Sequence, residues 1–172
     1  MELSMIAFER HLLAATGFME LGMFDDAAME IEKLDPRDKL RPEVFDFRAA
    51  LFAQAKEWGA MEVVTRRIVA LRPDDPEAWV NWAYATRWEA SLEAATEILL
   101  RAEKKCPHDA AIQFNLACYA CQMGNLVEAK RRVGAAISLD GKFRSRALDD
   151  PDLEPLWEDI AKELQQDSGS GH

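Results

Sequence analysis

The chain has 172 residues, enough for one compact domain or a short solenoid, and 49% of them are hydrophobic, which is ample for a core. Its formal net charge of −10 at pH 7 would repel the phosphates of long nucleic acid. No apolar stretch reaches the ~18 residues of a membrane span, and Glu2 places an acid where a signal peptide needs a base. Three cysteines without a spacing that demands a disulfide favour a reducing compartment. The sequence therefore predicts a cytoplasmic protein with no nucleic-acid partner and no membrane insertion.

Helix signals follow one another from the N-terminus. A first helix is predicted over residues 4–21, with Ser4 as its N-cap. Asp25 and Asp26 fall in the first turn of a second predicted helix, where negative charge suits the helix dipole. Pro36 shortens this helix by about one turn relative to the later helices. Further along, Pro42 and Pro76 suit the first turns of helices, and Asp75 is placed to cap the helix that Pro76 opens.

A helical hairpin is predicted over residues 110–141, where two amphipathic helices flank a turn at Gly124-Asn125. Its landmarks recur upstream at intervals of 34 residues without a gap. The first helix of each hairpin carries a small residue: Ala15, Ala49, Ala83 and Ala117. A position in the second helix recurs in the same way, as Ala27, Met61, Ala95 and Ala129. A bulky residue precedes this position by three residues in each hairpin: Phe24, Trp58, Leu92 and Leu126.

This strict period resembles the tetratricopeptide repeat (TPR) family, whose unit is a helix–turn–helix of 34 residues. The third repeat resembles the family most fully, with Trp79, Ala83, Ala95, Ala102 and Pro107. The resemblance implies an all-α fold, a right-handed superhelical solenoid of antiparallel helix pairs. We expect a single domain over residues 1–167, with repeats at about 8–41, 42–75, 76–109 and 110–143.

The pattern changes after Gly141. Residues 142–148 suit a short helix, Asp149-Asp150-Pro151-Asp152 breaks it, and apolar residues then recur at helical spacing from Leu153 to Leu164. We expect capping helices over about 142–166 that cover the last repeat, with Trp157 packed on the fourth hairpin. The alternative is a regulatory helix that folds into the binding groove. Residues 168–172 resemble an appended linker.

In the family that the chain resembles, the first helix of each repeat lines a concave groove that binds peptides. The resemblance implies a peptide-binding groove with these residues: Glu43, Asp46, Phe47, Glu77, Asn81, Tyr84, Arg87, Trp88, Phe114, Asn115, Cys118 and Gln122. Its carboxylates disfavour the lysine-rich clamp by which one subfamily holds chaperone C-termini, and favour an apolar peptide with basic character. The asparagines can pin a peptide backbone, and the aromatic residues are either anchors for side chains or part of the core.

No catalytic constellation emerges. Cys118 and Cys121 have the spacing of a redox pair but lie within a helix, away from the N-terminal dipole that activates such thiols. Only Cys106 and His108 could join them around zinc, and no glycine-rich phosphate loop is present. The sequence predicts no enzyme, no cofactor and no metal. The basic clusters at 66–67 and 130–132 are interpreted as solvated helix surface.

The predicted function is that of a non-enzymatic interaction module, an adaptor with a protein or peptide partner. Two alternatives stay open: a bacterial secretion-type TPR chaperone that holds an export substrate, and a structural subunit that assembles through its terminal helices. Leu3, Ile6 and Phe8 could serve a dimer contact or cap the first repeat. The chain is accordingly expected to be a monomer or a homodimer.

Overall fold

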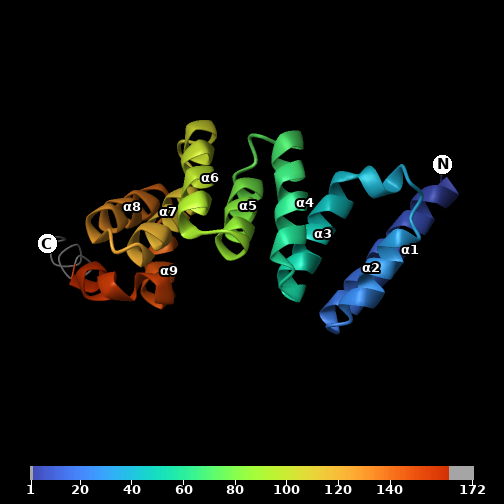
Figure 1. The fold of residues 1–172 in the computed structure, drawn as a ribbon, viewed down its shortest axis with the longest axis horizontal. Coiled ribbons are helices and arrows are strands. Elements are labelled where there is room, and N and C mark those ends of the chain that lie inside the picture. The colour runs from blue at the N-terminus through green and yellow to red at the C-terminus, as the bar shows by residue number, and fades with distance from the viewer. Residues whose placement is uncertain (1, 163–172) are drawn as a thin grey trace, which may run out of the picture. The chain divides into compact units, whose positions relative to one another are not determined.

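The computed structural model of the protein describes residues 2–162, and the regular elements within that range are all helical. In chain order they are α1 (Glu2–Glu20), α2 (Phe24–Glu32), η1 (Asp38–Leu40), α3 (Pro42–Ala55), α4 (Trp58–Leu71), α5 (Pro76–Glu89), α6 (Leu92–Lys105), α7 (Ala110–Gln122), α8 (Leu126–Leu139), α9 (Phe143–Asp149) and η2 (Pro151–Leu156) (Figure 1). Residues 157–162 are helical up to the last described residue. Within this range no helix combines the length and the apolar character needed to cross a membrane.

The helices pack in consecutive pairs, α1 with α2, α3 with α4, α5 with α6 and α7 with α8 (Figure 1). The prediction of an all-α fold of antiparallel helix pairs is therefore confirmed. The pairs fall into two compact units, which we call unit 1 (Met1–Pro73) and unit 2 (Asp74–His172). That all four pairs form one continuous solenoid stays a prediction.

Small side chains lie between the two helices of each pair, with Met61 in α4 as the larger exception. The eight residues that recur at these two positions of the 34-residue period are buried, and none is more than 5% exposed: Ala15, Ala27, Ala49, Met61, Ala83, Ala95, Ala117 and Ala129. Helix axes can approach closely only where the side chains between them are small. The recurrence of these residues therefore reflects one packing requirement that is met four times.

Helix ends follow the predicted chemistry in most places. Pro42 and Pro76 are the first residues of α3 and α5, and the Asp75 carboxylate accepts hydrogen bonds from the backbone N–H groups of Glu77 and Ala78. As predicted, α2 is short, with 9 residues against 14 in α4 and α6. The predicted start of α1 is wrong, because the helix begins at Glu2 and Ser4 lies inside it.

The core of unit 1 lies between α1, α2 and α3. Phe8 is 5% exposed within this core, and the Arg41 guanidinium lies 3.8 Å from the centroid of its ring. Phe8 is therefore not available for a dimer contact, whereas Ile6 is 57% exposed. The side chain of Leu3 lies outside the described residues.

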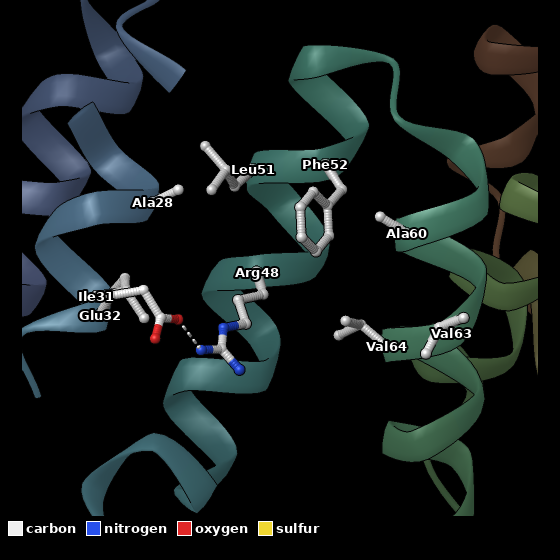
Figure 2. Close-up of a pocket in the computed structure, with 9 residues that line it drawn as sticks. All are labelled: Ala28, Ile31, Glu32, Arg48, Leu51, Phe52, Ala60, Val63 and Val64. Carbon is white, nitrogen blue, oxygen red and sulfur yellow. Dashed lines mark hydrogen bonds and ion pairs between the residues drawn. The ribbon is translucent and has the colours of Figure 1, made fainter. Parts of the chain in front are cut away.

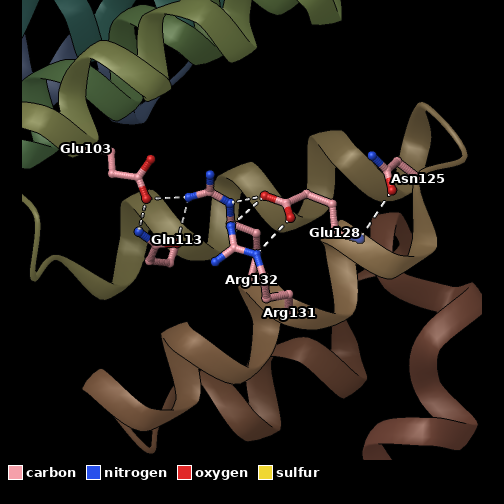
Figure 3. A network of polar contacts seen from close by, with 6 residues as sticks. All are labelled: Glu103, Gln113, Asn125, Glu128, Arg131 and Arg132. Carbon is pink, nitrogen blue, oxygen red and sulfur yellow. Dashed lines mark hydrogen bonds and ion pairs between the residues drawn. The ribbon is translucent and has the colours of Figure 1, made fainter.

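A polar network fixes α8 against α6 and α7 in unit 2 (Figure 3). Arg132 donates to Glu103 at 2.5 Å, to Glu128 at 2.7 Å and to Gln113 at 2.8 Å. Arg131 also donates to Glu128, at 2.6 and 2.8 Å. Arg132 is only 6% exposed, so the interpretation of residues 130–132 as solvated surface is wrong for this residue. A guanidinium can be buried here because carboxylates and a carboxamide receive its hydrogen bonds.

The C-terminal segment, which consists of α9 and η2, packs on α7 and α8. Ala147, Leu153 and Leu156 are buried, and η2 contacts α7, α8 and α9. The predicted α-helix from Leu153 is wrong up to residue 156, because the chain there forms a 3₁₀-helix that contains Pro155. Proline has no N–H for an α-helical hydrogen bond. The Trp157 Nε1–H donates to the carbonyl of Ala147, so this side chain is anchored on α9.

Replacing Ala117 or Ala129 with leucine should destabilise the protein by ~1–3 kcal/mol, because both side chains are fully buried where α7 meets α8. Urea unfolding monitored by circular dichroism measures this change. Ala135→Leu, at a half-buried position of α8, is the matched control and should change stability by less. Equal stability in all three variants would contradict the packing of this pair.

The network around Glu128 should make stability depend on acidity. Hydrogen bonds from Arg131 and then Arg132 lower the pKa of Glu128 from 4.5 to about 2. Since the pKa is lower in the folded state, the carboxylate stabilises the fold above about pH 4.5, and this contribution is lost as the pH falls towards about 2.

Glu128→Gln should therefore lower the free energy of unfolding near neutral pH, and the difference from the wild type should shrink as the solution is acidified towards about pH 2. Urea titrations at a series of pH values measure this. Glu97→Gln, on an exposed position of α6, is the control. A constant difference between wild type and Glu128→Gln at all pH values would contradict the assigned pKa.

Candidate functional site

The outer face of α5 carries a row of polar and aromatic side chains in unit 2. Glu77, Asn81, Tyr84 and Trp88 follow one another at helical spacing, so they lie along one side of the helix. Tyr84 is 37% exposed and Trp88 is 53% exposed. Their rings meet edge to face, with centroids 6.4 Å apart and an interplanar angle of 74°. This geometry is favourable for aromatic pairs, and it presents a broad apolar surface to solvent.

Arg87 connects the outer face of α5 to the C-terminal segment through hydrogen bonds. Its guanidinium donates to the Asp152 carboxylate at 2.7 Å and to the Gln122 side-chain carbonyl at 2.8 Å. Gln122 in turn donates to Asp152. The guanidinium also lies 5.1 Å from the centroid of the Trp88 ring, a cation–π contact that helps to orient the ring.

The electrostatics of Arg87 reflect this pairing. Burial by itself would lower its pKa, but the hydrogen bond and the negative charge of Asp152 outweigh burial and raise the pKa. The guanidinium therefore stays charged and the pair remains ionic. The side chains of Arg87 and Asp152 are 15% and 24% exposed, so the pair lies largely out of solvent.

The C-terminal segment covers the corresponding face of α7. Phe114 and Cys118, both predicted groove residues, are 1% and 4% exposed. The Phe143 ring centroid lies 5.0 Å from that of Phe114, and the Arg146 guanidinium lies 4.8 Å from the same ring. The structure therefore places Phe114 and Cys118 beneath α9 and η2 rather than on an open surface.

Three of the predicted groove residues belong to α3 in unit 1. Glu43 and Asp46 are exposed on α3, where Glu43 pairs with Arg41 at 3.5 Å and Asp46 accepts a hydrogen bond from Arg72. Phe47 is 8% exposed and belongs to the core of unit 1. The structure thus brings together Tyr84, Arg87, Trp88 and Gln122, while Glu43, Asp46 and Phe47 lie in the other unit.

Asn81 and Asn115, predicted as an equivalent pair, have different surroundings. Both are half-buried. The Asn115 carboxamide donates to the backbone carbonyl of Ala111 within its own helix, at 2.8 Å. Part of its hydrogen-bonding capacity is therefore used locally, which makes Asn81 the better placed of the two for a ligand.

Three potential metal ligands, Cys118, Asp150 and Asp152, lie within 4.8 Å of one another. Burial and then the charge of Asp150 strongly raise the pKa of the Cys118 thiol, and burial likewise raises the pKa of Cys121. Thiol–disulfide exchange requires a thiolate, so a raised pKa disfavours redox exchange at both cysteines. Asp152 is already paired with Arg87. We assign the buried side chains of Cys118 and Cys121 a packing role.

Sequence reasoning missed the residues of the C-terminal segment that reach the site. Asp150, Asp152 and Phe143 contact predicted groove residues, yet the sequence pattern of the acidic run 149–152 indicates only a helix breaker. The available signal was charge complementarity between this run and Arg87, the single basic residue of the predicted groove. Periodicity alone could not show which surface the run would meet.

No protein-family profile and no curated protein matches the sequence. Solved structures do match, at low sequence identity. A thermophilic TPR protein from Thermus thermophilus, TTC0263, is 17% identical with a TM-score of 0.66, over 89% of this chain and 82% of that one. MamA from Desulfovibrio magneticus RS-1 is 14% identical with a TM-score of 0.66, over 96% of this chain and 98% of that one. YrrB, described as a TPR protein with an unusual peptide-binding site, is 18% identical with a TM-score of 0.60, over 74% of this chain and 66% of that one.

These likenesses show that the chain has the tetratricopeptide fold. The expectation drawn from the 34-residue period is therefore confirmed at the level of fold.

Removing the Asp152 carboxylate should loosen the C-terminal segment. Asp152→Asn breaks an ionic pair that is largely shielded from solvent, and we expect a loss of roughly 1–2 kcal/mol, with faster amide exchange across η2. Hydrogen exchange followed by mass spectrometry measures both. Asp159→Asn is the control, because Asp159 pairs with Lys130 at 3.2 Å on an exposed surface. Equal protection of η2 in wild type and Asp152→Asn would contradict the role given to this pair.

Proposed function

We propose that the protein is a non-enzymatic interaction module that binds a peptide segment of a partner protein along the outer face of α5. The observation that carries this proposal is the pair of exposed aromatic rings, Tyr84 and Trp88, in edge-to-face contact. Tryptophan and tyrosine are enriched at the energetic centres of protein interfaces, and tryptophan is on average a highly buried residue, whereas Trp88 is 53% exposed. The peptide-binding site attributed to YrrB is a precedent for this activity in the same fold.

The chemistry of the row suggests what the peptide presents. Glu77 is exposed at the N-terminal end of α5, and the aromatic pair lies at the C-terminal end. A peptide with a basic residue opposite Glu77 and an apolar side chain on Tyr84 and Trp88 matches this order. The net charge of −10 further favours a basic ligand. Asn81 lies between the two ends, where its carboxamide can bond to a peptide backbone.

The C-terminal segment limits the site on its other side. Leu153 and Leu156 are buried, and Phe114 lies beneath the segment, so displacing it would expose a large apolar surface. We infer that the segment is a fixed cap and that the peptide does not extend onto α7. The regulatory alternative requires that peptide binding displaces this cap, which would appear as a loss of amide-exchange protection over residues 150–156.

A selection from a random peptide-display library against the whole protein tests the proposal. Peptides with a basic residue and an apolar anchor should be enriched, and Trp88→Ala should weaken their binding about 10-fold or more, because it removes the anchor surface. Fluorescence anisotropy with synthetic peptides measures the affinity. Val127→Ala, at a valine that is 85% exposed on α8, is the control and should leave the affinity unchanged.

Two outcomes would contradict a peptide site on the outer face of α5. Enriched peptides that bind Trp88→Ala as tightly as the wild type would place the site on another surface. An absence of enrichment, together with self-association in solution, would favour the structural-subunit alternative. The feature that supports that alternative is α1, where Ile6 and Leu13 are 57% and 75% exposed. A chaperone would instead be recognised by one export substrate bound at a fixed ratio.

A further inference from the structure

In addition to the outer face of α5 in unit 2, a surface of unit 1 has the features of a binding site. An apolar cleft of about 450 Å³ lies between α2 and α4, with α3 at its base (Figure 2). This volume falls within the range of ligand pockets. The apolar side chains that line it include Ile31, Leu51, Phe52, Ala60, Val63 and Val64. Val63 is 65% exposed at its edge.

The equivalent place in unit 2 is closed by polar side chains. Two periods of 34 residues along the chain, Ala60 corresponds to Glu128 and Val64 corresponds to Arg132. In unit 2 these two residues form the network that joins α8 to α6 and α7 (Figure 3). In unit 1 the same repeat positions hold an alanine and a valine, which cannot form such a bridge.

The short second helix adds to this difference. Glu103, the partner of Arg132 on α6, corresponds to Asp35, which lies beyond the end of α2 at Glu32. In unit 1, α4 therefore carries no cation at the position that corresponds to Arg132, and α2 ends before the position that corresponds to Glu103. The cleft therefore differs from the equivalent place in unit 2. Its sides are apolar, whereas ion pairs of Arg132 with Glu103 and Glu128 fill the space between α6 and α8.

The two ends of the cleft differ in charge. At one end, Glu32 accepts hydrogen bonds from Arg48 at 2.8 Å and from Lys39 at 2.7 Å, so two cations share one carboxylate and leave a net positive charge. At the other end α2 and α4 begin, where the exposed carboxylates of Asp25 and Glu57 outnumber the exposed Lys56. Figure 2 shows Glu32 and Arg48 at one end of the cleft and Ala28, Phe52 and Ala60 towards the other.

We propose that this cleft binds an amphipathic helix of a partner protein, which runs antiparallel to α2 and α4 and inserts apolar side chains between Phe52, Val63 and Val64. The partner helix carries Asp or Glu in its first turn, opposite Arg48 and Lys39. It carries Lys or Arg in its last turn, opposite Asp25 and Glu57. This charge order is also the one that the helix dipole favours, so the partner helix can satisfy both requirements at once.

A library of helical peptides with an apolar stripe and randomised charges in the first and last turns tests this proposal on the whole chain. Selected peptides should show acidic first turns and basic last turns. Val63→Asp should weaken their binding about 10-fold or more, because a carboxylate then enters the apolar contact. Val127→Asp, the same change at a more exposed valine on α8, is the matched control and should leave the affinity unchanged.

Ala60→Leu provides a second variant that does not add charge. Its larger side chain should occupy part of the cleft and weaken binding of the peptide by a similar factor, while thermal unfolding confirms that the fold is retained. Reversing the charges at both ends of a selected peptide should also weaken its binding to the wild type. The proposal is overturned if no peptide is enriched, if enriched peptides bind Val63→Asp as tightly as the wild type, or if charge reversal has no effect. Trp88→Ala should not affect these peptides, which separates this surface from the face of α5.

Discussion

The close approach of two helices at a small residue is the constraint on which the rest of the structure depends. Ala15, Ala49, Ala83 and Ala117 are all buried, each on the first helix of its pair. A larger side chain at these positions would force the helix axes apart and disturb every contact further along the pair. Because this requirement recurs at every pair, it sets the 34-residue period and the spacing of the faces on which other side chains are displayed.

The same repeat positions serve different purposes in the two units. Glu128 and Arg132 close the space between the second helices of unit 2 with a buried polar network, whereas Ala60 and Val64 leave an apolar cleft in unit 1. A buried guanidinium is stable only when every partner is in place. Apolar residues need no such partners, so that position can change its character without disturbing the pair itself.

The C-terminal segment decides which part of the first-helix surface remains open. It buries Phe114 and Cys118 beneath α9 and η2 and pairs Asp152 with Arg87. Among the described residues of unit 2 that were predicted to line the groove, the aromatic side chains still exposed are Tyr84 and Trp88 on α5. Ala147, Leu153 and Leu156 of this segment are buried and add to the apolar packing of α7 and α8. A surface that would otherwise be equivalent in both pairs of unit 2 is thereby restricted to one helix.

The sequence by itself determined the helix pairs, the buried alanines, the shortened α2 and the proline and aspartate signals at α3 and α5, because each depends on residues close together in the chain or on a fixed period. Only the tertiary structure decided that Phe47 and Phe114 belong to the core, that Arg132 is buried and that Asp152 meets Arg87. These outcomes depend on which side chains from distant elements share one space. Helical periodicity gives the face on which a residue lies but not what packs against that face, and it is this packing that places the candidate site on α5.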